Sequence, residues 1–223
     1  MIFFTSDTHL QHKNIIQYCT RPYPNVPTMD DKIIENWNKV VKRGDTVYHL
    51  GDFAFCCRRD EVEAFIKRLN GQIHLICGNH DKDNVRKAKG FASVRDIKKI
   101  TVKYKDEWGR ELYQDIVLCH YAMKVWEKSG HGSWQLYGHS HGTLPDDKHS
   151  FQCDVGVDNW NFTPVSFAQI REVMKKKYYI PQDYHGHTGL TTIPDGPPAP
   201  KSTGWIERDY QSGLYDFSDL FDK

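Results

Sequence analysis

Residues 2–9 of the chain read Ile-Phe-Phe-Thr-Ser-Asp-Thr-His, an apolar run that ends in a carboxylate and an imidazole. A short apolar run bounded by polar residues predicts a buried strand. Asp7 and His9 would then follow its C-terminal end, where the loops of an open α/β sheet hold ligands. Four similar runs occur farther along the chain, and this repeated arrangement decides the fold that we expect.

The later runs also end in side chains that can bind a metal ion. They cover residues 46–50, 73–77, 116–119 and 134–137. The polar groups that follow them are Asp52, Asn79-His80-Asp81, His120, and the pair His139 and His141. Any one of these groups is a weak signal, because an isolated histidine on a strand is usually a packed core residue. Together, and in this order, they predict a centre for two metal ions.

Helical stretches separate the first three runs. Apolar residues recur at helical spacing after a helix start near Thr28, and again from about Asp60 to Leu69. Alternation of strand and helix implies a parallel sheet, whose strands end at one edge. We therefore expect Asp7, Asp52 and Asn79 to lie close together.

The second half of the chain has a different pattern. Residues 97–105 and 111–119 flank a Trp-Gly turn, which predicts an antiparallel hairpin. A short strand is expected within 150–155 and a closing helix over 164–176. The residues alone thus predict a mixed-sheet α/β domain over 1–177. Proline and glycine become frequent after this point, so 178–223 is predicted to be a C-terminal extension, loosely structured or draped on the domain. A partner-binding peptide is the alternative for this extension.

Composition excludes several classes of protein. The 223 residues carry 30 Lys and Arg against 29 Asp and Glu, which argues against a dominant field for nucleic acid or membrane. No apolar segment approaches the roughly 20 residues of a membrane span. The first residues lack the basic region of a secretion signal, and the six cysteines show no disulfide spacing. We expect a cytoplasmic protein with reduced thiols.

The five motifs together resemble those of the calcineurin-like metallophosphoesterases, from Met1 to about Lys177. Residues 4–16 are similar to a branch of this family common in bacteria and their phages. The resemblance implies two packed mixed sheets flanked by helices. It also implies hydrolysis of phosphate esters, as a phosphodiesterase or phosphatase, by a hydroxide that bridges two metal ions.

The resemblance further implies a ligand set for each ion. One ion would be held by Asp7, His9, Asp52 and His141, and the other by Asp52, Asn79, His120 and His139, with Asp52 as the bridge. His139 and His141 would point the same way if their segment is extended. Nitrogen and oxygen ligands without a thiolate favour Mn²⁺, Fe, Zn²⁺, Ni²⁺ or Co²⁺ over Mg²⁺ and Ca²⁺. We expect manganese to support activity.

Two residues outside the ligand set are assigned to catalysis by the same resemblance. His80 would stabilise the transition state or protonate the leaving group, with Asp81 fixing its ring. From spacing alone, His80 could equally be a hydrogen-bonding residue farther from the ions. The candidates for substrate contact are His12, Asn14, Arg21, Arg58 and Arg59. The alternative is that these five are surface residues.

The substrate is expected to be a phosphate ester, with a small or nucleotide-type phosphodiester favoured. A nuclease acting on RNA or DNA is the alternative, because lysines and aromatic residues are interleaved on the predicted hairpin. A non-catalytic scaffold is a third hypothesis, but a scaffold has no need of the complete ligand set. No protein partner of the C-terminal extension can be named from its sequence.

Overall fold

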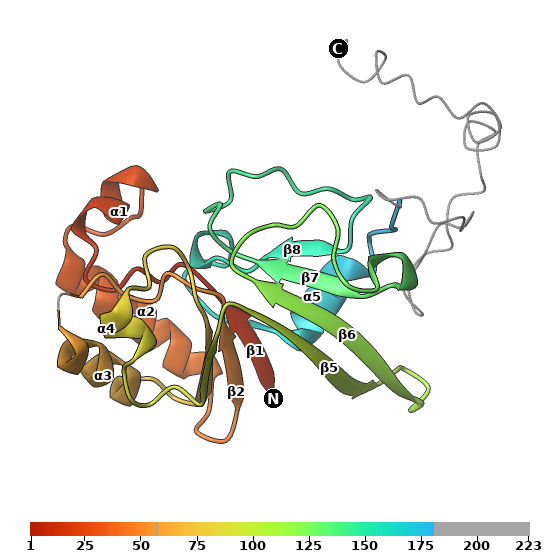
Figure 1. The fold of residues 1–223 in the computed structure, drawn as a ribbon, viewed down its shortest axis with the longest axis horizontal. Coiled ribbons are helices and arrows are strands. Elements are labelled where there is room, and N and C mark those ends of the chain that lie inside the picture. Colours follow the sequence, from red (N-terminus) through yellow and green to blue (C-terminus); the bar gives the residue numbers. More distant parts are fainter. Residues whose placement is uncertain (57, 181–223) are drawn as a thin grey trace, which may run out of the picture.

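The strands of the computed structural model, which describes residues 1–56 and 58–180, form two β-sheets (Figure 1). The first sheet has the order β4-β3-β2-β1-β9 and the second β5-β6-β7-β8. The strands of the first sheet are β1 Ile2–Thr5, β2 Thr46–His49, β3 Gln72–Ile76, β4 Ser93–Arg95 and β9 Val165–Ser166. Those of the second are β5 Ile97–Lys105, β6 Glu111–Cys119, β7 Trp134–Tyr137 and β8 Gln152–Asp154. Both sheets are mixed, as expected for this α/β fold.

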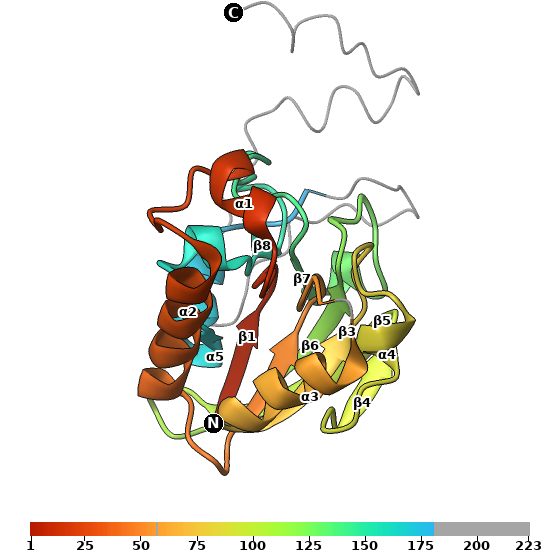
Figure 2. The ribbon, with the colours of Figure 1, turned by 90° about the vertical axis from the view of Figure 1, so that its left-hand side faces the viewer.

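Within the described residues, five α-helices pack around the sheets. They are α1 Lys13–Tyr18, α2 Val26–Val40, α3 Arg59–Arg68, α4 Asp83–Arg86 and α5 Phe167–Met174. Short 3₁₀ turns at Ser129–His131 and Val157–Asn159 complete the described elements. Figure 2 shows α2 and α3 covering one face of the first sheet.

Successive side chains of β1 belong to two different hydrophobic cores, one on each face of the first sheet. Phe3 belongs to the core beneath α2 and α3, together with Trp37 of α2. Phe4 points to the other face and joins Leu118 of β6 and Ile170 of α5 in the second core. Successive side chains of a strand point to opposite faces, so the first sheet is buried on both sides. This explains why β1 is a mostly apolar run.

Parallel pairing gathers the loops that carry the motifs. β1 pairs in parallel with β2, and β2 with β3, so their C-terminal ends share one edge. In the second sheet β7 is parallel to β6 and to β8, while β5 and β6 form the expected antiparallel hairpin. The hairpin covers the two predicted segments, and its register runs from the pair Ile97 and Cys119 to the pair Lys105 and Glu111.

Two element boundaries differ from the sequence-based expectation. Helix α2 begins at Val26, before Thr28, because the Asn25 side chain caps it by accepting the Thr28 N–H at 3.0 Å. Residues 165–166 form β9, which pairs antiparallel with β1, so the closing helix begins only after Ser166. Ser166 and Gln169 form a capping box at this point.

The packed chain continues beyond Lys177. Tyr179 is 1% exposed in the second core, and its hydroxyl donates to Ser129 Oγ at 3.0 Å. The backbone N–H of Ile180 donates to the His149 carbonyl at 3.0 Å. Residues 178–180 therefore pack with the domain, whereas the remainder of the predicted extension, 181–223, lies outside the described residues. Within 1–56 and 58–180, none of the helices combines the length and apolar character of a membrane span.

Candidate metal centre

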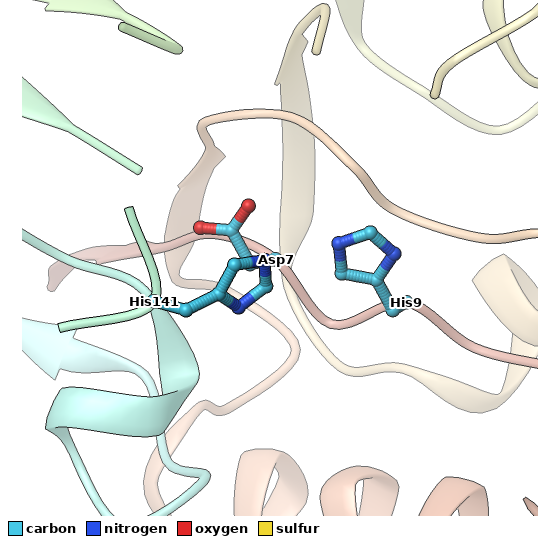
Figure 3. Close-up of side chains that lie close together, drawn as sticks. All are labelled: Asp7, His9 and His141. Atoms are coloured by element: carbon cyan, nitrogen blue, oxygen red, sulfur yellow. The ribbon is translucent and has the colours of Figure 1, made fainter. Parts of the chain in front are cut away.

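The loops after β1 and β7 bring three metal-binding side chains together. Asp7 and His9 come from the first loop and His141 from the second, and one ligand atom of each lies within 4.8 Å of the others. Figure 3 shows these three side chains lying close together. A second group, formed by Asp52, His120 and His139, meets the same distance criterion. The fold thus collects six of the seven expected ligands into two neighbouring groups.

Asp52 belongs to the second group but also lies next to the first, and Asn79 lies beside the second. Oδ2 of Asp52 is 3.5 Å from Nε2 of His9 and 3.5 Å from Nε2 of His120. Oδ1 of Asn79 is 3.0 Å from the same nitrogen of His120 and 3.1 Å from Nδ1 of His139. One carboxylate oxygen is therefore placed where it can serve both groups, and an amide oxygen completes the second.

Unpartnered buried atoms indicate that cations belong in this space. Oδ1 of Asp7 and Nε2 of His9 are buried and have no hydrogen-bond partner. The other carboxylate oxygen of Asp7 is engaged by Ser6 Oγ at 2.7 Å and by the His139 N–H at 2.9 Å. Leaving a buried acceptor unpaired costs free energy that a bound divalent ion would offset. The donor set of carboxylate, imidazole and amide groups fits a transition-metal ion.

Burial also sets the charge states of the two carboxylates. It raises the pKa of Asp7 to about 7, so a nearby cation is needed to keep this group fully ionised at neutral pH. Burial of Asp52 acts in the same direction, but the hydrogen bond with His120 and the charges of His120 and His9 outweigh it. They hold the pKa of Asp52 well below its ordinary value. Asp52 is therefore ionised at neutral pH, next to the imidazoles of both groups.

The backbone at the centre is strained. Five of the seven expected ligands have the left-handed conformation that non-glycine residues rarely adopt: Asp7 (φ 57°), His9 (49°), Asp52 (56°), His139 (68°) and His141 (47°). Each such residue costs on the order of 1 kcal/mol and persists only when surrounding structure enforces it. The segment holding His139 and His141 is therefore not extended, which corrects the expectation from alternation. Both side chains are placed by tight turns after β7.

Glycines in the motifs allow the loops to approach one another. A Cβ atom on Gly138 would lie 1.8 Å from Ser6 Oγ and 2.5 Å from Asp7 Oδ2. One on Gly78 would lie 2.2 Å from Asp52 Oδ1. Real Cβ atoms do not approach so closely, so any side chain here would displace a carboxylate from its position. The glycines are needed for the geometry of the centre.

We expect Gly138→Ala to lower both the free energy of unfolding, by roughly 1–3 kcal/mol or more, and the metal affinity, because overpacking must push Asp7 away. Gly44→Ala is the matched control, since nothing lies within 4 Å of its added methyl group. Denaturant unfolding and Mn²⁺ titration of both variants measure the two effects. Equal behaviour of the two variants would show that the approach of Gly138 to Asp7 is unimportant.

Asp81 differs from its expected role. The sequence-based prediction has Asp81 fixing the ring of His80, but its carboxylate oxygens instead accept backbone N–H groups. The donors are Asp52 at 2.9 Å, Phe53 at 3.0 Å and Gly78 at 2.8 Å. Asp81 is buried, and these bonds join the loop after β2 to the loop after β3. We infer that Asp81 positions Asp52 and Asn79 and does not act on the reacting groups.

Arg21 is also placed differently from the prediction that it contacts substrate. Its buried guanidinium donates to both carboxylate oxygens of Asp158, at 2.8 and 2.9 Å, and to the carbonyls of Asp7 at 2.7 Å and Thr8 at 3.1 Å. Asp158 in turn accepts from Nδ1 of His141 at 2.7 Å. Because these donors are used inside the protein, Arg21 holds ligand loops together and orients an imidazole through Asp158.

The other predicted contact residues lie in different surroundings. His12 lies at the centre, with Nδ1 3.1 Å from Nδ1 of His9. Asn14 is exposed on α1, and Arg59 is exposed at the start of α3. Arg58 is exposed and pairs with Asp60 beside the capped end of α3. For these four residues, contact with substrate stays a prediction.

Sequence reasoning missed Asp158 and two exposed aromatic residues, Phe55 and Tyr121. Asp158 lies a few residues after the end of strand β8. A carboxylate shortly after a strand is the sequence signal that could have identified it. Phe55 and Tyr121 each lie a few residues from a ligand, and their exposure cannot be read from sequence. Asp158 and Tyr121 lie beside side chains of the expected ligand set, and Phe55 lies beside His80.

Comparison with known proteins agrees with this geometry. The model of the calcineurin-like phosphoesterase superfamily domain matches residues 1–157. An uncharacterized protein of Methanocaldococcus jannaschii is 32% identical over 181 residues, covering 78% of this chain and 92% of that protein. The gene 66 protein of Mycobacterium phage L5 is 28% identical over 183 residues, covering 71% and 86% respectively.

A solved structure shares the fold. The crystal structure of a protein of unknown function from Aquifex aeolicus aligns with a TM-score of 0.54 and 24% identity, covering 78% of this chain and 98% of that one. The phage relative agrees with the resemblance of residues 4–16 to a branch found in phages. Since the family model spans most of the described residues, the chain belongs to the calcineurin-like phosphoesterase superfamily and is a metal-dependent phosphoesterase.

Proposed function

We propose that the chain hydrolyses phosphodiesters at a centre of two divalent transition-metal ions bridged by Asp52. The observation that carries this proposal is the position of Asp52 Oδ2, 3.5 Å from one imidazole of each ligand group. Its partner oxygen Oδ1 accepts the His80 backbone N–H at 2.8 Å, which leaves Oδ2 for the ions. A bridging carboxylate offsets the repulsion between two cations held about 4 Å apart.

The ions would be held by the residues already described. Asp7, His9 and His141 would complete one site, and Asn79, His120 and His139 the other. When bound, such a pair supplies a water of lowered pKa and neutralises charge on the phosphoryl oxygens. We propose manganese as the activating metal, because imidazole mixed with carboxylate and amide oxygen suits it.

His80 is proposed as the residue that acts on the leaving group. Its backbone is fixed by Asp52, and its ring lies 5.5 Å from the ring of His9 and is partly exposed. The side chain thus lies beside the residues that would hold the ions, on the side open to a bound ester. From this position it can donate a proton to the departing oxygen or a hydrogen bond to the phosphoryl group.

A nuclease is a weaker candidate. Two of the hairpin lysines, Lys99 and Lys103, form ion pairs with Glu127 and Glu111, so acids neutralise part of the proposed basic surface. The hairpin therefore gives no particular support to binding of a polynucleotide backbone.

The test compares turnover of a nitrophenyl monoester, a nitrophenyl diester, a cyclic nucleotide and an oligonucleotide after chelation and after addition of Mn²⁺. We expect hydrolysis only with added metal and a preference for the diester.

His80→Ala should keep its metal content and lose about 10²- to 10⁴-fold in kcat, the usual contribution of a proton-transfer residue. His131→Ala is the control, because His131 lies before the N-terminal end of β7, away from His139. Absence of turnover with every substrate and metal would contradict the proposal, and loss of bound metal in His80→Ala would contradict the role of His80.

A further inference from the structure

We propose that Phe55, stacked on His12, is a platform for the base of a nucleotide ester bound at the metal centre. This inference rests on the proposed function and names the substrate class: a phosphate ester of a single nucleoside. Phe55 is an exposed apolar ring beside a site made almost wholly of polar groups.

Phe55 is 48% exposed, although its neighbours Phe53 and Ala54 are buried. The rings of Phe55 and His12 are stacked, with centroids 4.3 Å apart and planes inclined by 13°. The rings of Phe55 and His80 form a T-shaped pair, with centroids 5.7 Å apart. An exposed aromatic ring beside the ligand loops offers a flat apolar face on which a base can stack.

The platform is rigidly connected to the metal ligands. The Phe55 N–H donates to the Leu10 carbonyl at 2.7 Å, and the Leu10 N–H donates to the Phe53 carbonyl at 3.1 Å. Leu10 and Ala54 also form a parallel bridge between the first two motif loops. Phe55 is therefore fixed to the same two loops that carry His9 and Asp52, and little ordering is needed when a ring stacks on it.

The platform lies within reach of the reacting groups. The rings of His12 and His9 have centroids 5.1 Å apart. Phe55 thus contacts His12, and His12 contacts the expected metal ligand His9. His80, the proposed proton donor, touches Phe55 directly. A base on Phe55 would place the adjoining sugar phosphate toward the ions, and a phosphate ester without an aromatic group would leave the platform unused.

Tyr121 is a second exposed ring at the centre, but it fits this role less well. It is 47% exposed and meets the imidazoles of His120 and His139 edge-on, with centroids 5.0 and 4.7 Å away. Its hydroxyl lies 3.4 Å from Oδ1 of Asn79. These contacts engage its ring and its polar group with the second ligand set. Phe55 has no polar atom to satisfy and is the better surface for a neutral base.

The test measures how much the base adds to binding. Adenosine 5′-monophosphate, ribose 5-phosphate and inorganic phosphate are compared with Mn²⁺ present, as inhibitors of nitrophenyl diester hydrolysis and by titration calorimetry. In the wild-type protein we expect the adenine to tighten binding about tenfold or more, as stacking on one aromatic side chain does. In Phe55→Ala and Phe55→Leu this gain should disappear while phosphate affinity stays near the wild-type value, and Phe55→Tyr should keep the gain.

Trp108→Ala is the matched control, because Trp108 is also an exposed aromatic residue but lies at the turn of the hairpin between β5 and β6. An adenine gain that is equal in wild type and Phe55→Ala would overturn the platform. A tetranucleotide that binds far more tightly than the mononucleotide would overturn the assignment to a single nucleoside. Because calorimetry does not require turnover, absence of hydrolysis with an intact adenine gain would count against the proposed function alone.

Discussion

Asp52→Asn is expected to abolish metal-dependent hydrolysis. The change keeps the size of the side chain but removes the negative charge that lies between the two ligand groups, 3.5 Å from an imidazole of each. Both ions would lose affinity together, and the fall in kcat/KM should exceed about 10³-fold, since loss of one transition-state donor alone costs about 10²–10³. Metal analysis and steady-state kinetics on the purified variant measure the two losses.

Asp31→Asn is the control for this substitution. Asp31 is an exposed carboxylate on α2 whose described ion pair is with Arg68 at the surface, so its loss should leave turnover unchanged. If Asp52→Asn kept wild-type turnover, or lost one ion while the other stayed bound with full affinity, the bridging role of Asp52 would be wrong.

Arg21→Ala is expected to be the most destabilising of the changes considered. It removes a buried guanidinium and leaves Asp158 short of a charged partner, with the carbonyls of Asp7 and Thr8 unpaired. Breaking a buried ion pair from one side costs about 3–5 kcal/mol, which denaturant unfolding would record as a lower free energy of unfolding. Metal affinity should also fall about 10- to 100-fold, because Asp158 no longer holds His141 firmly.

Arg68→Ala is the matched control, since it breaks the ion pair with Asp31 at the surface and should cost less than about 1 kcal/mol. Arg21→Lys tests whether the positive charge alone is sufficient, because lysine keeps the charge but lacks the planar guanidinium that donates two hydrogen bonds to Asp158. If Arg21→Ala were as stable as Arg68→Ala, the buried network would not support the centre.

The elements that carry the motifs were predictable because each is a local pattern. The runs ending before Asp7, Asp52 and Asn79 are strands of the first sheet, and each is rich in apolar or aromatic residues. The hairpin was readable from two periodic segments around one turn. Strand β9 was not, because two residues that pair with β1 carry no periodicity of their own and only the tertiary fold makes them a strand.

The supporting residues of the centre were beyond sequence reasoning for a related reason. Arg21 and Asp158 are 137 positions apart, and nothing local distinguishes this buried pair from two surface charges. Asp81 follows His80 directly, yet its carboxylate turns to backbone amides of another loop. The identity of the ligands follows from which side chains lie at strand ends, whereas the identity of their supports depends on how the loops fold over one another.

Anomalous diffraction at the manganese edge, from crystals grown with Mn²⁺, tests the dinuclear centre most directly. We predict two peaks about 4 Å apart, one beside Asp7, His9 and His141 and one beside Asn79, His120 and His139, with Asp52 Oδ2 between them. A single peak, or two peaks that do not share Asp52, would contradict the account.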